Sequence, residues 1–377
     1  MKILGFNPSH HGSVCLLEDG EINFFIEEER LTRRKHDGGT FSSFIHILQN
    51  YNVDIITWGT PSLSYPLFMG SSLSYWEIIA SKFNKTFKKA IDFSPSQHHT
   101  CHASHAFYNS GFKESLCLII DGVGSAFLDD NNKYMGQETE TIFKCSYPNN
   151  FKVLYKNFKF PESSMNLSQV YEAVTMHLGW EVNEAGKTMG LAPYGKSNKN
   201  FPNFFLENKG NSKIFYTDHD QDPIIGYPHK FFHFIDDKNN SQFKLKVHPK
   251  EWHYDESKIT SLEKDLAWKV QNDTQQLVGD YIEKAIQETG LKQVCCAGGY
   301  FLNCVTNYYL LKRFPGIEFY FEPIANDSGT AIGASKLVWH KETQDTTIRP
   351  LKSLYLGKQY SKEELLEGIK KYVDTSQ

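Results

Sequence analysis

The first thirty residues alternate short apolar runs with polar turns, which is the pattern of paired β-strands. The stretches are KILGFN (2–7), SVCLLEDG (13–20) and EINFFIEEE (21–29), and an Asp-Gly pair ends the second of them. Such a pair between apolar runs favours a β-hairpin. A similar unit recurs at SLCLIIDGVGSAFL (115–128), and a third apolar run, a double glycine and a helical pattern follow one another at KQVCCAGGYFLNCVTNYYLLKRF (292–314). We therefore expect several strands that end at glycine-rich turns.

Helical spacing of apolar residues appears between these strands. It is found in HASHAFYNS (102–110) and over 259–290, where Gly290 is a typical helix stop. Strands, glycine turns and helices in alternation indicate an α/β architecture. The polar, weakly periodic segment from Asp218 to Tyr254 is interpreted as an insertion or a long surface excursion.

The composition of the chain mainly excludes several classes of protein. The 377 residues carry a net charge of −4, with 40% hydrophobic and 22% charged residues, which is ordinary for a globular chain long enough for two lobes. The near-neutral charge gives no overall argument for nucleic acid. Seven cysteines, without a C-x-x-C pair, fit a reduced compartment better than a disulfide framework. No signal peptide and no apolar stretch long enough to span a membrane is recognised, so we expect a cytoplasmic protein.

Three glycine-containing turns follow predicted strands: Asp121–Ser125, Ala297–Asn303 and Asn326–Gly333. Turns of this kind expose backbone N–H groups that bind phosphate oxygens, although each alone is more often structural. Together they suggest a nucleotide cleft between two lobes. Neither a Walker A pattern nor a G-x-G-x-x-G after a strand occurs, so the P-loop and Rossmann interpretations fail.

Four histidines lie within HHTCHASHAF (98–107). His98 and His102 are one helical turn apart and His105 is a further turn along, so a metal site with carboxylates from Asp121 and Asp327 is one hypothesis. The other hypothesis is a surface helix that its histidines merely cap and hydrogen-bond. Spacing alone leaves both open.

Further chemistry is suggested at three places. His10, in the first turn, is a candidate general base because its free pKa lies near neutrality, and the alternative is an ordinary loop histidine. The stretch EVNEAGKTMGLAPYG (181–195) combines Glu184 and Lys187 with small residues, which suits close approach to a ligand or simply a tight loop. Lys35 follows a dense charge run, where most lysines are solvated.

These pieces, in this order, resemble the O-carbamoyltransferase family of nodulation-factor and antibiotic-tailoring enzymes. The stretches that carry the resemblance are GFNPSHHGSVCLLEDG, EEERLTRRKHDGG, HHTCHASHAFYNSGF, LIIDGVG, NEAGKTMGLAPYG, AGGYFLNCVTN and PIANDSGTAIGAS, which together span residues 3 to about 335. The family's fold is an actin-like (ASKHA), two-lobed, ribonuclease-H-like α/β fold with a metal and nucleotide cleft, related to the tRNA threonylcarbamoyl transferases.

The resemblance also implies a reaction. Family members make carbamoyladenylate from carbamoyl phosphate and ATP and pass the carbamoyl group to a hydroxyl, with Fe²⁺ or another divalent metal in the transfer domain. By motif matching, the metal ligands are His98, His102, Asp121 and Asp327, and the catalytic residues are His10 and Lys35. The residues expected to line the adenylate are Gly122, Glu184, Lys187, Gly190, Gly298, Gly299, Asn303 and Asn307.

The sequence departs from the family's pattern in several ways. His11 stands where Asp is usual, Ser125 where Glu often follows the turn, and Tyr300 is bulkier than the usual residue. The arginine-rich signature of the family's YrdC-like, carbamoyladenylate-forming domain is not found. We therefore expect a transfer domain over residues 1–350, and over 351–377 the start of a link to that YrdC-like domain, whether the chain is truncated or receives the adenylate from a partner.

Several alternatives remain at this stage. An actin-like kinase shares the cleft, although such kinases hold Mg²⁺ without histidine. A non-catalytic nucleotide- and metal-binding subunit is the hypothesis of another class. The acceptor is open among small molecules, sugars and a hydroxymethylated nucleobase in DNA. The basic and aromatic stretch Lys82–Phe93 would suit nucleic acid, but a solvated helix face is the simpler interpretation. No membrane partner is expected, and a homodimer stays open.

Overall fold

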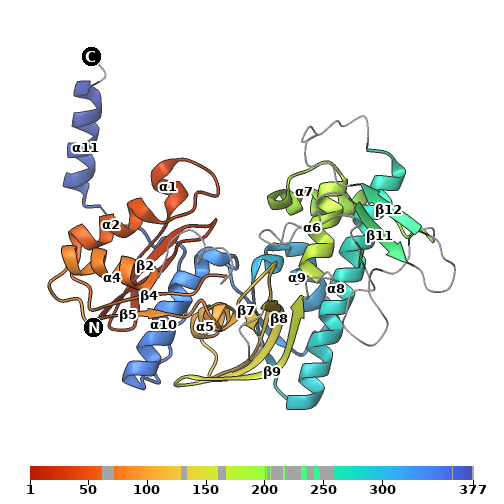
Figure 1. The fold of residues 1–377 in the computed structure, drawn as a ribbon, viewed down its shortest axis with the longest axis horizontal. Coiled ribbons are helices and arrows are strands. Elements are labelled where there is room, and N and C mark those ends of the chain that lie inside the picture. The colour runs from red at the N-terminus through yellow and green to blue at the C-terminus, as the bar shows by residue number, and fades with distance from the viewer. Residues whose placement is uncertain are drawn as a thin grey trace.

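The computed structural model describes residues 1–61, 72–128, 134–159, 167–199, 201, 204, 215–216, 231–235, 242–246, 259–358 and 360–375. Figure 1 shows two lobes joined through a middle layer that contains the helices α5 (His98–Ser110) and α10 (Thr330–Thr343). Most of the predicted insertion at 218–254 lies outside the described residues. Only the short strands β11 (Phe231–Ile235) and β12 (Gln242–Lys246) are described there, and β12 and β10 (Phe215–Tyr216) both pair with β11.

The first lobe is a five-stranded sheet in the order β3-β2-β1-β4-β5. Its strands are β1 (Lys2–Asn7), β2 (Ser13–Glu18), β3 (Glu21–Glu27), β4 (Ile55–Trp58) and β5 (Lys89–Asp92). The chain folds back twice through β1, β2 and β3, which are antiparallel, and β4 and β5 then add in parallel to β1. The strands predicted from the N-terminal pattern are thus confirmed. The helices of this lobe are α1 (Glu28–Thr32), α2 (Phe41–Asn50) and α4 (Ser72–Phe83).

The second lobe repeats this order. Its central strand β6 (Glu114–Ile120) pairs antiparallel with β8 (Tyr134–Ser146), which pairs antiparallel with β9 (Asn150–Lys159). On the other side β13 (Gln293–Ala297) and β14 (Glu318–Phe321) add in parallel. The short β7 (Ala126–Leu128) is an extra partner of β8. A sheet order that occurs twice, with the same strand directions, is the two-lobed actin-like arrangement of ribonuclease-H-like halves, and the expected fold is confirmed.

Helices cover the second sheet and close its core. They are α6 (Leu167–His177), α7 (Ala185–Leu191), α8 (Ser261–Thr289) and α9 (Cys304–Arg313), with the 3₁₀ turns η1 (Val182–Glu184), η2 (Ala192–Tyr194), η4 (Gly299–Leu302) and η5 (Asp327–Gly329). The long helix predicted over 259–290 is therefore α8, and Gly290 ends it at a φ of 70°. Thr260 and Glu263 form the capping box that starts it.

The helices α5 and α10 pack so closely that only glycine fits at their contact. A Cβ on Gly333 would lie 1.9 Å from the carbonyl oxygen of Cys101, and the Ser104 hydroxyl donates to the carbonyl oxygen of Gly333. Likewise, a Cβ on Gly5 in β1 would lie 2.0 Å from the carbonyl oxygen of Ala331. The start of α10 is thereby fixed against both α5 and the first sheet.

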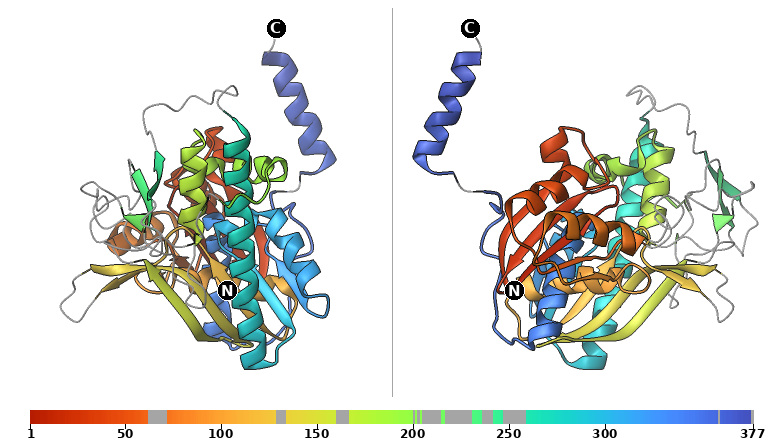
Figure 2. Two further views of the ribbon diagram at one scale, coloured as in Figure 1. Left: turned by 90° about the vertical axis from the view of Figure 1, so that its right-hand side faces the viewer. Right: turned by 60° about the vertical axis from the view of Figure 1, so that its left-hand side comes forward.

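The chain ends in α11 (Lys362–Thr375), which stands away from both lobes in every view (Figures 1 and 2). Residues 351–361 link it to the body without forming a helix or strand over their described part. Among the residues that the structure describes, no helix has the length and apolar character needed to cross a membrane.

Candidate functional site

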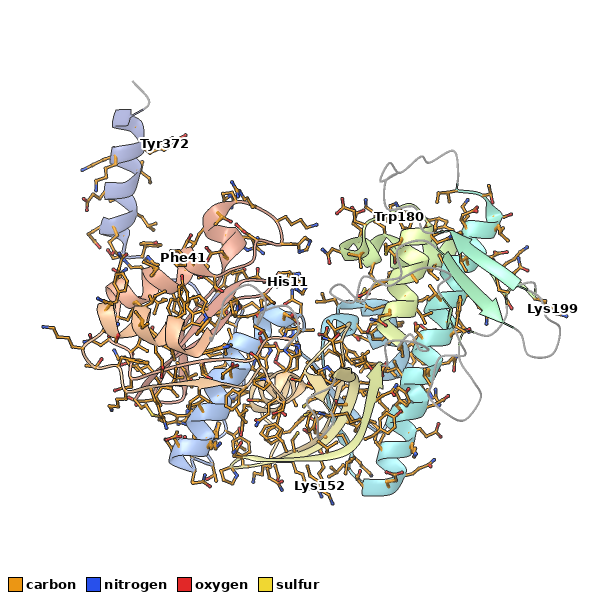
Figure 3. All side chains as sticks on the ribbon, in the orientation of Figure 1. His11, Phe41, Lys152, Trp180, Lys199 and Tyr372 are labelled. Atoms are coloured by element: carbon orange, nitrogen blue, oxygen red, sulfur yellow. The ribbon has the colours of Figure 1, made fainter. Side chains whose placement is uncertain are left out.

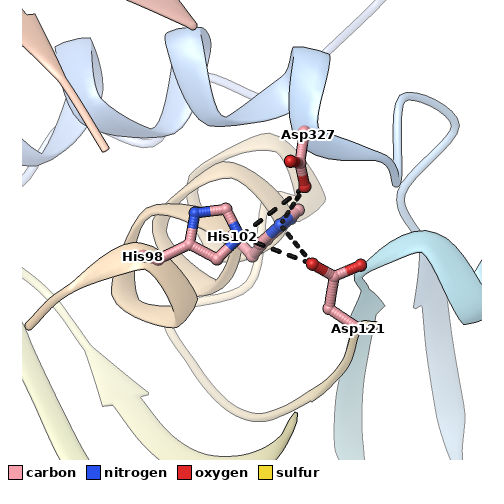
Figure 4. Close-up of side chains that lie close together, drawn as sticks. All are labelled: His98, His102, Asp121 and Asp327. Atoms are coloured by element: carbon pink, nitrogen blue, oxygen red, sulfur yellow. Dashed lines mark hydrogen bonds and ion pairs between the residues drawn. The ribbon is translucent and has the colours of Figure 1, made fainter. Parts of the chain in front are cut away.

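Two histidines and two aspartates meet between the lobes (Figure 4). His98 and His102 come from α5, Asp121 from the residue directly after β6, and Asp327 from η5. One potential ligand atom from each residue lies within 4.8 Å of those of the other three, and all four residues are buried. The interpretation of HHTCHASHAF as a surface helix is therefore wrong, because α5 is buried almost throughout.

The Nε2 atoms of both histidines face the carboxylates. His98 Nε2 lies 3.4 Å from Asp121 Oδ2 and 3.6 Å from Asp327 Oδ1. His102 Nε2 lies 3.4 Å from Asp327 Oδ1 and 4.0 Å from Asp121 Oδ2. These separations are what four ligands around one small ion require, since each would sit about 2.0–2.2 Å from it.

Backbone groups orient the cluster. His98 Nδ1 lies 2.8 Å from the carbonyl oxygen of Gly59, to which it donates, and this bond leaves Nε2 facing the carboxylates. The Gly299 N–H donates to Asp121 Oδ1 at 3.1 Å. Asp327 opens η5, where the side chain of Asn326 caps the turn. The sequence pattern predicts that Asp327 lies in a turn directly after a strand. It lies instead at the start of the turn that leads into α10, six residues beyond the last residue of β14.

The electrostatics favour an added cation. Burial opposes protonation of His98, but Asp121 and Asp327 outweigh it and hold the pKa of His98 well above its ordinary value. Burial likewise opposes ionisation of Asp327, and the two histidines outweigh it, so the pKa of Asp327 is well below its usual range. In the described part of the chain, neither ring nitrogen of His102 has a hydrogen-bond partner. Buried polar atoms without partners are costly, and a divalent transition metal would satisfy its Nε2 and both carboxylates.

The cluster lies at the wall of a cavity of about 310 Å³, to which Asp121 and Asp327 contribute. The first lobe lines it with His10, His11, His36 and Pro61. The second lobe contributes residues from α6, η1, α7 and the turns after β6 and β13. They are Gly122, Val123, Ser168, Tyr171, Glu172, Val182, Asn183, Ala185, Gly186, Met189, Gly299, Tyr300, Leu302 and Asn303, and Asn326 adds to them from beside Asp327.

A row of three histidines forms the first-lobe wall, and Figure 3 shows His11 facing the second lobe. His10 is 57% exposed, and its Nδ1 lies 3.9 Å from Asp327 Oδ2. His11 packs on the ring of His10 at 4.2 Å between centroids, and its Nε2 lies 3.1 Å from Nδ1 of His36. Burial lowers the pKa of His11 to about 4, so its ring is neutral at physiological pH. Lys35 is exposed and does not belong to the lining.

The predicted nucleotide residues divide into two groups. Gly122, Gly299 and Asn303 line the cavity. The side chain of Asn303 is also used internally, because it caps α9 and bonds to Gln271. The remaining predicted residues fall outside the described lining, and they are Glu184, Lys187, Gly190, Gly298 and Asn307.

Four of the five predicted residues outside the lining have structural contacts. Glu184 and Lys187 form an ion pair with each other at 2.5 Å. Asn307 donates to the carbonyl oxygen of Phe301 at 2.9 Å. Gly298 holds a φ of 95° immediately before Gly299, and a Cβ there would lie 2.2 Å from the carbonyl oxygen of Ile120. Gly298 therefore shapes the turn rather than the cavity surface.

Sequence reasoning missed the wall that α6 provides. Ser168, Tyr171 and Glu172 line the cavity, but their helix shows only ordinary amphipathic spacing. Their role depends on the second sheet bringing α6 next to the turn at Gly122. A Cβ on Gly122 would lie 3.3 Å from Glu172 Oε1. No local signal in the sequence marks this contact.

Two of the departures from the family's pattern have a structural explanation. The Ser125 hydroxyl accepts from the His98 N–H at 3.0 Å and donates to the carbonyl oxygen of Ser94, so it anchors the start of α5. Tyr300 is buried, and its hydroxyl lies 3.1 Å from that of Thr306.

His105 lies one helical turn beyond His102 on α5 but faces Glu322 and not the cluster. Its Nε2 lies 3.3 Å from Glu322 Oε1.

Known proteins resemble the chain over most of its length. The family model described as "Carbamoyltransferase N-terminus" matches residues 65–336. An uncharacterized protein of Synechocystis, sll1178, is 28% identical over 98% of this chain and 62% of its own length. The nodulation protein NolNO of Sinorhizobium fredii is 25% identical over 95% of this chain and 50% of its own length. The chain thus spans about half to two thirds of these relatives.

Solved structures also superpose on the chain, at low similarity. Full-length HypF in the phosphate- and nucleotide-bound form matches with a TM-score of 0.45 and 12% identity, over 90% of this chain and 55% of HypF. The assignment of the fold therefore depends on the repeated strand order described above.

Proposed function

Because the chain belongs to the family of carbamoyltransferase N-terminal domains, we propose that it transfers a carbamoyl group from carbamoyladenylate to a hydroxyl of an acceptor. In this proposal the adenylate derives from carbamoyl phosphate and ATP. The observation that carries the proposal is the cluster of His98, His102, Asp121 and Asp327 on the wall of a cavity of about 310 Å³. That volume lies at the small end of the range found for ligand pockets.

The metal's contribution is charge stabilisation. A divalent ion, Fe²⁺ in the first instance, would be held by the two histidine Nε2 atoms and the two carboxylates, and it would polarise the phosphate or carbamoyl oxygen. The chain's own groups fix the ligands, through the carbonyl oxygen of Gly59 on one side and the N–H of Gly299 on the other.

His10 is the proposed base. A carbamoyl carbon is a poor electrophile, and an acceptor hydroxyl is a weak nucleophile at neutral pH. In the proposed step the hydroxyl oxygen forms a bond to the carbamoyl carbon, its proton passes to His10, and the carbon–phosphate oxygen bond breaks with its electron pair leaving on AMP. Such general-base assistance contributes about 10²–10⁴-fold. The exposed ring of His10 at the cavity wall supports this role, and Lys35 is proposed as a cation near the same pocket.

Backbone groups would hold the adenylate. The turns at Gly122 and Gly299 present main-chain atoms to the cavity, and the apolar side chains of α6 and α7 lie opposite the histidine row. We propose that the AMP moiety lies along the second-lobe wall and that the carbamoyl group points to the metal ligands. The acceptor then enters past His10.

The source of the adenylate is proposed to be a YrdC-like domain or protein. The chain spans only about half to two thirds of its relatives, and the matched family model is that of the N-terminal part. On this proposal residues 1–350 are the transfer domain and residues 351–377 lead towards the activating one.

A nucleic acid acceptor gains little support from the surface. In the stretch Lys82–Phe93, Lys88 pairs with Asp54 at 3.0 Å and Lys89 with Glu342 at 2.9 Å, so part of its positive charge is already neutralised. Salt-dependent DNA binding by the protein would favour a modified nucleobase as acceptor, and its absence would favour small molecules or sugars.

The proposal is tested by supplying carbamoyladenylate directly. The purified chain with Fe²⁺ is expected to release AMP from carbamoyladenylate faster than the uncatalysed reaction, and His98→Ala is expected to abolish the acceleration. His10→Asn should slow the release while metal binding persists, because His10 is not one of the four ligands. Metal and AMP binding without any acceleration would instead indicate a non-catalytic subunit.

A second arm locates the activation step. Incubating the chain with carbamoyl phosphate, ATP and Fe²⁺ and measuring pyrophosphate shows whether this chain makes the adenylate itself. We expect none, and its formation would overturn the assignment of activation to a YrdC-like partner.

A further inference from the structure

The carboxylate of Glu138, on β8, is buried and does not line the cavity. The residue is only 1% exposed. A buried carboxylate is costly unless charges and hydrogen bonds compensate it. Here the backbone N–H groups of His99 and Ser125 both donate to Oε1 at 3.1 Å, and the ammonium group of Lys156 pairs with Oε2. Glu138 therefore joins two segments, the start of α5 and the turn after β6.

The bond from His99 places the carboxylate at the first turn of α5. The first N–H groups of a helix have no partner within the helix. In α5 the N–H of His98 donates to Ser125 Oγ at 3.0 Å, and the N–H of His99 donates to Glu138. A negative charge at this end of a helix is also favourable. These bonds fix the backbone of His98, whose side chain is one of the proposed metal ligands.

The bond from Ser125 places the same carboxylate against the turn that begins at Asp121. The N–H of Gly124 donates to the carbonyl oxygen of Glu138 at 2.8 Å, and the N–H of Glu138 donates to the carbonyl oxygen of Ser125 at 3.0 Å. A Cβ on Gly124 would lie 2.4 Å from Glu138 Cγ, so the turn packs directly on this side chain. The next residue of β8, Thr139, accepts from the N–H of Asp121 at 3.0 Å.

We propose that Glu138 is a positioning residue for the metal site, because its Oε1 holds the segment of His98 and the segment of Asp121 together. The two proposed ligand atoms, His98 Nε2 and Asp121 Oδ2, lie 3.4 Å apart. Without Oε1, two N–H groups of buried residues would lose their acceptor, and α5 and the turn would shift relative to each other. The inference rests on the metal site of the proposed function, but it does not depend on which group is transferred.

Glu140 offers a matched comparison on the same strand. It lies two residues beyond Glu138 and is likewise 1% exposed. Its carboxylate accepts from the N–H of Leu167 at 3.1 Å and from Asn157 Nδ2 at 2.9 Å. Substitution of Glu140 therefore removes a buried carboxylate that is bonded to α6 and β9, whereas substitution of Glu138 removes one that is bonded to α5 and the turn.

Anaerobic titration with Co²⁺ in place of Fe²⁺ tests the inference, because the visible absorption of Co²⁺ depends on the geometry of its ligands. Two double variants share Lys156→Met, so that no lysine is left beside a missing carboxylate. Glu138→Met in the first removes the acceptor, and Glu138→Gln in the second keeps one oxygen for the two N–H groups.

The first double variant should bind Co²⁺ about 10–100-fold more weakly than the wild type, with altered absorption, because a partner that orients the ligands is lost. The second should bind like the wild type, which is the rescue expected of a positioning role. Glu140→Met is the control. It should lose stability in urea, since a buried hydrogen-bonded group is removed, but should bind Co²⁺ with unchanged affinity and absorption.

Glu138→Gln alone is the milder test if the first double variant does not fold. It sets an amide group against the ammonium group of Lys156, so it should bind Co²⁺ more weakly than the same change combined with Lys156→Met. Equal binding by these two variants would count against the role of Glu138.

Other outcomes contradict the inference directly. Wild-type binding by the first double variant overturns it, and so does an equal loss in both double variants, because the acceptor oxygen would then be irrelevant. An equal loss in Glu140→Met would show a general effect of stability and also overturns it. A wild-type chain that does not bind Co²⁺ at all overturns the metal site of the proposed function, and this inference with it.

Discussion

The N–H of Gly299 donates to Asp121 Oδ1 at 3.1 Å, while Asp121 Oδ2 lies 3.4 Å from Nε2 of His98. One carboxylate is thus held from two sides, by the turn after β13 and by α5. The two segments are far apart in the sequence, and their meeting at Asp121 couples the glycine turn to the cluster of His98, His102 and Asp327. The contribution of the turn can therefore be tested by measuring protein stability, without any assay of activity.

Gly298→Ala should destabilise the protein by about 3 kcal/mol, since the substitution combines backbone strain with a steric clash. Gly298 has a φ of 95°, and a Cβ there would lie 2.2 Å from the carbonyl oxygen of Ile120. Urea unfolding measures the change. Gly316→Ala is the matched control, because nothing lies within 4 Å of its added Cβ, and it should change stability by less than about 0.5 kcal/mol. Equal stabilities for the two variants would show that the turn tolerates a side chain at position 298.

His102→Ala should weaken binding of Fe²⁺ by at least ~100-fold, because it removes one of the four proposed ligands. Loss of a partner that only orients a ligand already costs about 10–100-fold. Anaerobic calorimetry measures the affinity. The wild type should also gain about 4 kcal/mol of stability at a metal concentration ~1,000 times its dissociation constant, and the variant should gain at most about 1.4 kcal/mol at the same concentration. His46→Ala, an exposed histidine on α2, is the control and should bind like the wild type. Undiminished binding by His102→Ala would place the metal elsewhere.

Gly186→Leu should block AMP binding while metal binding persists. Gly186 lines the cavity from α7, and its own Cβ position is open, so the larger side chain would occupy space in the cavity rather than clash locally. Gly190→Leu is a close control, because Gly190 lies one turn along the same helix, also has an open Cβ position, and does not belong to the described lining. Loss of AMP binding in both variants would restore the sequence-based assignment of Gly190 to the nucleotide site.

Glu322→Gln should flatten the pH dependence of stability. Burial raises the pKa of Glu322 from 4.5 to about 7, against the opposing hydrogen bonds from Ile324 and Asn109. The protonated side chain is therefore favoured in the folded state. Its contribution is fully present below pH 4.5 and is lost as the pH rises through about 7, with a total of about 3 kcal/mol.

The measurement is urea unfolding at pH 5 and pH 7.5, comparing Glu322→Gln with the wild type. The wild type should lose more stability than the variant between these pH values. Glu318→Gln, at an exposed position of β14, should follow the wild type. Parallel pH curves for the wild type and Glu322→Gln would show that Glu322 does not titrate in this range.

The sequence predicts the first three strands of the first lobe, because each of these apolar runs is bounded by a polar turn, but it does not predict β4 and β5. It also predicts α8, whose capping box and terminal Gly290 are local signals. The spacing of His98 and His102 predicts that the two rings share a helix face, but their burial depends on α10 covering α5. That contact joins residues more than two hundred positions apart, and no periodicity within either helix reveals it.

Local sequence patterns also predict only part of the cavity lining. Gly122 and Gly299 are marked by their turns, and both line it. Tyr171 and Met189 line it too, yet each has the pattern of an ordinary apolar position of a helix. Their place is decided by how α6 and α7 lie on the second sheet. The pairing of His11 with His36 likewise depends on the loop after α1, in which Arg33, His36 and Thr40 all adopt positive φ values.

The repeated strand order makes the two central strands, β1 and β6, counterparts of one another. The loop after β1 carries His10, and the loop after β6 carries Asp121, so the proposed base and a proposed metal ligand lie in corresponding loops of the two halves. The site is therefore built across an internal symmetry of the chain.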